Sequence, residues 1–147
     1  MTRLPALLAA VSLSLAACAT DPAPAEYSID DQPAAAASFV TPTDGETVTS
    51  PFVVVLAADG IELTPAGIPA VGEGHLHVNV DIGCYPPGES IPGPSEQDEA
   101  AGRFHLGDGS DSREITLEPG TYELCVQLAD GVHRAFGATQ TITVTVE

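Results

Sequence analysis

The sequence predicts an all-β fold, an immunoglobulin-like antiparallel β-sandwich of about seven strands over residues 39–147. Short runs of apolar and β-branched residues recur between turn signals in this region. Several of these runs alternate apolar and polar side chains, as strands with one buried face do. Helix-period patterns are absent from the region. The chain has 147 residues, so it has room for one domain of ordinary size and no second core.

The first seventeen residues have the features of a bacterial signal peptide. Arg3 precedes an apolar run over residues 4–17, and this run is shorter than the roughly 20 residues that span a bilayer. The sequence LAAC at 15–18 resembles the lipobox of bacterial lipoproteins, in which the cysteine receives a diacylglycerol and becomes the new amino terminus. The alternative is ordinary secretion, with cleavage after the small residues at 17–19.

The lipobox resemblance implies a lipid on Cys18 and therefore a membrane anchor. Ala19 follows the cysteine, and by analogy with lipoprotein sorting we expect the outer membrane, with the protein facing the periplasm. Residues 18–38 are rich in Ala, Pro and Asp, and Tyr27 and Ile29 are their only bulky apolar side chains. Such a segment buries too little apolar surface to fold, so we expect a flexible linker between the anchor and the domain.

The first predicted strands are rich in β-branched residues. Strand signals begin at residues 39–40 and continue in the run SPFVVVLA at 50–57, with Asp-Gly turns on either side of that run. Residues 75–82 then alternate, with apolar side chains at even positions and His, His, Asn and Asp at odd positions. This alternation predicts a half-buried strand whose outer face is unusually polar.

A long surface loop is predicted next, because residues 84–102 are rich in proline and glycine and show no period. The segment LEPGTYEL at 117–124 resembles the corner that opens strand F of many immunoglobulin-like sandwiches. Tyr122 and the apolar residues that alternate with it are predicted to face inward, which leaves Cys125 on the outer face. The remaining strands are predicted at 103–106, 113–117, 121–128 and 139–146.

Charge and cysteine content restrict the partners and the compartment. The chain has 21 acidic residues against 4 Arg, for a net charge of −17, so nucleic acid is disfavoured as a partner and a soluble monomer is expected. If Cys18 carries lipid, Cys84 and Cys125 remain in a compartment where thiols oxidise, and they are predicted to form one disulfide. That bond would stabilise the domain by roughly 3 to 4 kcal/mol.

Pairing of the strands at 75–82 and 121–128 would bring distant histidines together. Antiparallel neighbours share their outer face, so the disulfide would clamp the long loop above that face, and the turn after the second strand would lie beside the start of the first. Two histidines spaced two residues apart on a strand are about 6.5 to 7 Å apart and can share one ion. The predicted metal ligands are His75, His77, His133 and His105.

The residue types predict which ion this face would hold. Imidazole-rich sites suit both Cu(II) and Zn(II), so we expect Cu or Zn. Asp81, farther along the same face, is predicted to orient one imidazole. The alternative is a face without metal, in which the imidazoles form hydrogen bonds to the loop. The acidic turn GDGSD at 107–111 lacks the distal Glu and the full spacing of a calcium loop, and a solvated turn is expected there.

Several landmarks recur in the order found in one known family. They are SPF at 50–52, TPAG at 64–67, GHLH at 74–77 with Asp81, FHLG at 104–107, LEPG at 117–120 and ADGVH at 129–133. They resemble the uncharacterised family called domain of unknown function 4399, whose members are short exported or lipid-anchored bacterial proteins. This resemblance implies no activity. Leu76 between the paired histidines, and Arg134 and Ala135 after the last one, depart from members with more histidines and argue against a multi-metal site.

A likeness to copper-zinc superoxide dismutases is poor, because Gly74 precedes the histidine pair and the spacing of the downstream histidines differs. The sequence shows no Ser/His/Asp or Cys/His set with an identifiable nucleophile, so no enzyme is predicted. The expected function is a non-enzymatic, lipid-anchored binding domain of the envelope that holds Cu or Zn. The alternative is a structural or protein-interaction module of the envelope that holds no metal.

Overall fold

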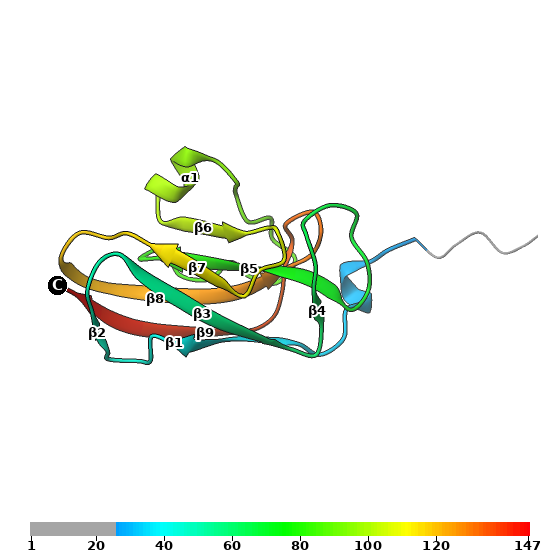
Figure 1. Ribbon diagram of the computed structural model, residues 1–147. Helices are drawn as coiled ribbons and strands as arrows, with labels where there is room; N and C mark the ends of the chain where they lie inside the picture. Colours follow the sequence, from blue (N-terminus) through cyan, green and yellow to red (C-terminus); the bar gives the residue numbers. More distant parts are fainter. Residues whose placement is uncertain (1–25) are drawn as a thin grey trace, which may run out of the picture.

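The computed structural model describes residues 26–147, and their architecture is all-β, which confirms the predicted fold class (Figure 1). The short helical elements are η1 (Ile29–Asp31) and α1 (Glu96–Ala100). The strands are β1 (Ala36–Thr41), β2 (Thr47–Val48), β3 (Phe52–Asp59), β4 (Glu62–Leu63), β5 (Glu73–Val80), β6 (Arg103–Leu106), β7 (Ser112–Ile115), β8 (Gly120–Ala129) and β9 (Ala135–Val146).

These strands form one curled sheet whose two halves close on a single core. The order along the sheet is β4-β5-β8-β9-β1-β3-β7, with β6 added beside β5 and β2 beside β9. The long strand β9 joins the halves, because it pairs with β8 on one side and with β1 and β2 on the other. The largest core side chains that are fully buried are Val54, Leu76, Val78, Leu106, Ile115, Leu124, Val126 and Leu128.

The pairing of β5 with β8 positions the histidine face. The two strands are antiparallel, with Val78 opposite Val126 inside the core. On the other face of the same pair, Asn79 lies opposite Cys125. The strand alternation and the Tyr122 corner therefore gave the correct neighbours and the correct face for the cysteine, because a one-residue slip would have moved every core side chain to the wrong side.

The packed domain begins earlier than residue 39, which corrects the predicted linker over residues 26–38. Strand β1 starts at Ala36, pairs with the end of β3 and buries Ala37. Upstream of it, the Gln32 side chain donates to the carbonyl oxygen of Ala70 at 3.0 Å and accepts from the backbone N–H of Gly72 at 2.9 Å. Backbone pairing, the hydrogen bonds of Gln32 and the hydroxyl of Tyr27, which donates to Asp130, hold this segment, and none of them is visible in a count of bulky apolar residues.

The predicted signal peptide, Cys18 and the first part of the predicted linker lie outside the described residues. Over residues 26–147, no helix is long and apolar enough to cross a membrane. The predicted surface loop contains the short helix α1, whose first turn is capped by Ser95. Ile82 is 43 % exposed and not inward-facing, because β5 ends at Val80 and Asp81 adopts a left-handed backbone with φ 57°.

Candidate metal centre

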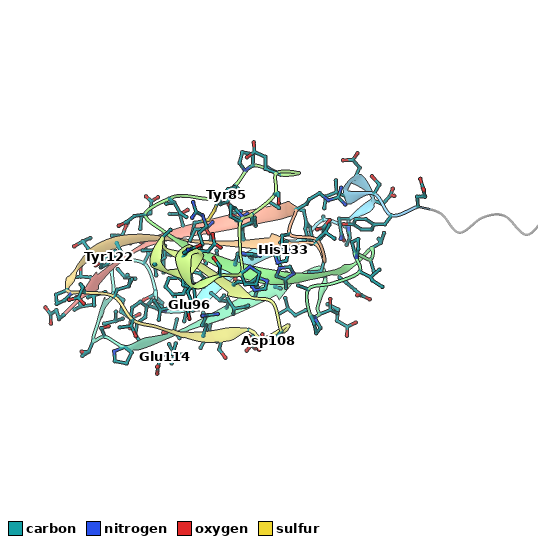
Figure 2. The ribbon with its side chains drawn as sticks, turned by 90° about the horizontal axis from the view of Figure 1, so that it is seen from above. Tyr85, Glu96, Asp108, Glu114, Tyr122 and His133 are labelled. Carbon is teal, nitrogen blue, oxygen red and sulfur yellow. A yellow bond between two sulfur atoms is a disulfide. The ribbon has the colours of Figure 1, made fainter. Side chains whose placement is uncertain are left out.

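The outer face of β5 is as deeply buried as its core face. His75, His77 and Asn79 have no exposed surface although they point away from the core. The sequence predicts a half-buried strand here, and the structure differs because β6 extends the sheet beside β5 and the loop after Cys84 folds over this face, where it is bonded to Cys125 and Gln127 of β8. Figure 2 gives the view from above, with Tyr85 of this loop and His133 labelled. Polar groups at these positions are therefore shielded from water.

All four predicted histidines meet at this place, and they come from three separate elements. His75 and His77 project from the same face of β5. His105 lies on β6 directly opposite His77 in the strand register. His133 lies in the turn between β8 and β9, which is adjacent to the start of β5 because His75 pairs with Ala129. The cluster thus joins two neighbouring strands and one turn.

The ligand atoms lie at distances suited to one ion. One ring nitrogen from each histidine lies within 4.8 Å of the other three. The Nε2 atoms of His75 and His77 are 3.0 Å apart, and so are those of His105 and His133. Tetrahedral bonds of about 2.0 to 2.1 Å would place nitrogens about 3.3 to 3.4 Å apart. Small movements of the side chains would therefore bring all four onto one ion.

Burial keeps the inner imidazoles in the neutral form that binds metal. It lowers the pKa of His75 from 6.5 to about 3, and the neighbouring imidazoles of His105 and His133 act in the same direction. Burial likewise lowers the pKa of His77 to about 2. The pKa of His105 is also lowered, first by burial and then by His133 and Arg113. A metal ion requires an unprotonated ring nitrogen, so the fold removes the competing proton in advance.

The contacts of the imidazoles favour a shared cation over bonding to the loop. The closest polar contacts within the cluster join one imidazole to another. Among the described residues, the Nδ1 atoms of His75 and His77 are buried without a hydrogen-bond partner. Unpaired buried polar atoms are costly, so the loop does not supply the hydrogen bonds that the alternative requires. The Nε2 atoms meet in pairs in which only one ring can donate a proton, whereas a cation can accept a lone pair from every ring.

A buried carboxylate that sequence reasoning missed builds the turn of His133. Asp130 has no exposed surface, and its Oδ1 accepts from the backbone N–H groups of Val132 and Arg134 at 3.0 and 2.9 Å. Its Oδ2 accepts from the hydroxyl of Tyr27 at 2.8 Å and from Nε of Arg134 at 3.0 Å. These bonds hold the turn in which His133 adopts a left-handed backbone, with φ 68°. In the sequence, the only signals for this turn were the Asp-Gly dipeptide at 130–131 and the arginine four residues after the aspartate.

Asp81 does not orient an imidazole, and that prediction is wrong. Its side chain is exposed at the far end of β5, where Oδ1 accepts a hydrogen bond from the backbone N–H of Glu123 at 2.8 Å. The alternation of residues 75–82 placed it on the histidine face only as long as the strand continued. Because the strand stops at Val80 and the backbone turns, Asp81 leaves that face.

The loop after β5 is attached to the histidine face at two points. Cys84 and Cys125 form a disulfide with a Cα–Cα distance of 5.7 Å, as predicted. Beyond it, the backbone N–H of Ile91 donates to the carbonyl oxygen of His133 at 2.8 Å, and Ala135 exchanges backbone hydrogen bonds with the Gly88–Glu89 turn. Ile91 is only 1 % exposed. The loop therefore pairs with the segment that carries one of the four histidines.

A polar network that the sequence did not reveal fixes the loop between these points. Gln127, which lies opposite His77 on β8, accepts from the backbone N–H of Tyr85 at 2.8 Å through Oε1. The same oxygen accepts from Nδ2 of Asn79 at 3.0 Å.

The acidic turn at 107–111 lies at the surface. The carboxylate of Asp108 is exposed and accepts from the N–H and hydroxyl of Ser110. That carboxylate closes its own turn, as expected of a solvated turn.

Comparison with known proteins assigns most of the β-domain to a family but gives no activity for it. The model of a family described as a domain of unknown function (DUF4399) matches residues 54–147, which include all four histidines and both paired cysteines. No curated protein matches the chain.

Proposed function

The chain belongs to the DUF4399 family, and because that family has no assigned activity, we propose the function from the site itself: the protein is an exported, lipid-anchored binding module that holds one Cu or Zn ion. The ligands are His75, His77, His105 and His133. The observation that carries this proposal is the approach of four ring nitrogens to within 4.8 Å of one another. Both metals prefer such imidazole sets.

The proposed role is storage or transfer of the ion, and not catalysis. Structural zinc sites use four protein ligands, whereas catalytic sites keep a position open for water or substrate. Four histidines are available here, and the nearby carboxylate of Asp130 already accepts four hydrogen bonds, so it is not free to act as a general base.

Metal uptake by the purified protein tests the site. We expect one Cu(II) or Zn(II) per chain after equilibration at micromolar metal with excess Mg(II), followed by dialysis and elemental analysis. The Mg(II) occupies carboxylates, because a net charge of −17 attracts cations without specificity. A matched pair of variants separates binding by the histidines from attraction to the acidic surface. His105→Asn should lose the ion, and Asp108→Asn should keep it. Absence of uptake would favour the alternative of an interaction module without metal.

The anchor is tested separately, because it depends on Cys18 alone. We expect the parent protein to fractionate with outer membranes and to carry the mass of a diacylglycerol on its first residue. Cys18→Ala should leave the protein soluble or unprocessed, with its metal content per folded chain unchanged. A parent protein whose first residue lacks the mass of a diacylglycerol would contradict the lipid anchor and leave the metal site untouched.

A further inference from the structure

Three large apolar side chains are exposed around the end of the molecule that holds the histidine cluster. Ile68 is 93 % exposed, Val71 55 % and Val132 48 %. Ile68 and Val71 belong to the loop between β4 and β5, and Val132 belongs to the turn that carries His133. The loop and the turn touch, because the backbone N–H of Gly67 donates to the carbonyl oxygen of Gly131 at 2.8 Å. We call these three residues the apolar rim.

The amino-terminal segment enters the domain at the same end. The hydroxyl of Tyr27 donates to Asp130 in the His133 turn, and the guanidinium of Arg134 lies 5.4 Å from the centroid of the Tyr27 ring. Gln32 is hydrogen-bonded to Ala70 and Gly72 in the loop that carries Ile68 and Val71. Figure 1 shows this end opposite the carboxyl terminus. The tether and the apolar rim therefore share one end of the sandwich.

The length of the tether limits where the anchor can lie. Seven residues lie between Cys18 and Glu26, and the eight Cα–Cα steps that join the two positions span about 28 Å at full extension. Strand β9 alone has 12 residues, which corresponds to about 40 Å along the sandwich. A lipid on Cys18 is therefore too closely tethered to reach the far, carboxyl-terminal end of the sandwich, and the membrane surface must lie within about 28 Å of the point where Glu26 enters the domain, beside the apolar rim.

We propose that the apolar rim, Ile68, Val71 and Val132, docks on the lipid surface to which Cys18 is anchored, so that the histidine cluster faces the membrane. The inference rests on the lipid anchor proposed above. A diacylglycerol places two acyl chains in the bilayer, which hold the protein at its surface, and a few apolar side chains inserted at the interface would fix how the domain lies on that surface. Isolated exposed apolar residues are ordinary. Here three of them surround the end of the sandwich at which the amino-terminal segment enters, and this arrangement matches the geometry of an interfacial contact.

Charge determines which headgroups suit this contact. Asp30 and Asp31 are exposed in η1 at the same end, and the whole chain carries a net charge of −17. Anionic headgroups repel such a surface, and zwitterionic headgroups do not. The partner is therefore a zwitterionic lipid surface, contacted by apolar tips and not by basic residues.

The protein contains no tryptophan, so a single one reports on the contact. We would prepare lipidated full-length protein with Ile68→Trp and, as a matched control, with Val53→Trp. Val53 is 48 % exposed and lies six residues before the end of β3 that pairs with Ala36, which is about 20 Å along the strand. Both proteins are bound to phosphatidylcholine vesicles with brominated chains, and binding is first verified by flotation.

We expect Trp fluorescence at position 68 to shift to the blue and to be quenched at least threefold more than at position 53, with less quenching when phosphatidylglycerol is added. Flotation with equal quenching at the two positions would overturn the docking alone. Failure to float would overturn the anchor and the docking together. A blue shift at position 68 that depends on protein concentration without vesicles would assign the rim to a second copy of the chain, and that outcome also overturns the proposal.

Discussion

The backbone of His133 shows that the histidine cluster is built at a cost. A non-glycine residue at φ 68° is disfavoured by about 1 to 2 kcal/mol, because its Cβ approaches the following carbonyl oxygen. Here the conformation is imposed by the hydrogen bonds of Asp130 and by the N–H of Ile91, which donates to the His133 carbonyl oxygen. Strain of this kind concentrates at functional positions. The left-handed backbone of His133 directs its imidazole toward those of the other three histidines.

Replacement of His133 by Asn or by Ala separates the strain from the ligand. Asn tolerates the left-handed region and Ala does not, so apo His133→Asn should match the parent in urea unfolding, and His133→Ala should be about 1 kcal/mol less stable. Both should weaken Zn(II) binding by more than tenfold in competition with a chromophoric chelator. Parent-like affinity in His133→Asn would exclude this imidazole as a ligand.

Gly107 is predicted to be required by the imidazole of His105. A β-carbon added at position 107 would overlap the His105 ring, although no left-handed backbone is needed there. In Gly107→Ala the ring must rotate away, and we expect metal affinity to fall about 10- to 100-fold, as when the orientation of a ligand is lost. Gly120→Ala is the control, because its β-carbon would lie 3.3 Å from the movable Tyr122 ring. Equal affinities in the two variants would show that His105 does not bind.

The individual site residues differ in how far the sequence could predict them. His75 and His77 followed from strand alternation, and His133 from the antiparallel pairing of their strand with β8. Asp130 was missed because its partners are two backbone N–H groups, an arginine and a tyrosine 103 residues away. Only a folded turn assembles those groups. The error at Asp81 arose because alternation does not reveal where a strand ends.

At the scale of elements, the loop after β5 connects the disulfide to the metal ligands. Cys84 attaches its start to β8, and the Gly88–Ile91 stretch pairs with the backbone of residues 133–135. A loop held at both ends limits the movement of His133. The state of the disulfide is therefore expected to affect the metal centre, although neither sulfur belongs to the histidine cluster.

Removal of the disulfide should loosen both the domain and the site. For Cys84→Ala with Cys125→Ala we expect a stability loss of roughly 4 kcal/mol, because the bond closes a loop of 41 residues. Zn(II) affinity should fall, and amide hydrogen exchange at Ile91 and Ala135 should quicken before that of core strand β8. Reduction of the parent by a dithiol should give the same exchange pattern. Unchanged protection at Ile91 would show that the loop holds its place without the disulfide.

Strands could be predicted from the sequence where their apolar residues alternate with polar ones or form a continuous run. Strand β6 was predicted at its observed residues, and the cores of β3, β5, β8 and β9 were predicted within a few positions. The start of β1 was missed because its small alanines pair through the backbone. The strands β2 and β4 have two residues each, which is too short for any periodicity.

At the scale of the whole molecule, burial of the inner histidines couples the fold to pH. Folding lowers the pKa of His75 to about 3 and that of His77 to about 2, chiefly through burial. In the unfolded chain both imidazoles have a pKa of about 6.5. Above pH 6.5 both states are neutral at these residues, and the shifts have no effect. Below it, the unfolded chain binds protons that the folded chain does not.

The apo protein should therefore lose stability as the pH falls from about 6.5 toward 3. Each buried histidine contributes a slope that approaches about 1.4 kcal/mol per pH unit, so the pair contributes up to about 3. His77→Gln should remove about half of this slope, whereas His105→Asn, at a half-exposed position, should change it less. Urea unfolding at several pH values measures the slopes. Bound Zn(II) should move acid unfolding to lower pH, because it binds the folded chain and adds its binding free energy to the stability wherever it remains bound. Identical curves with and without Zn(II) would contradict a metal held by these residues.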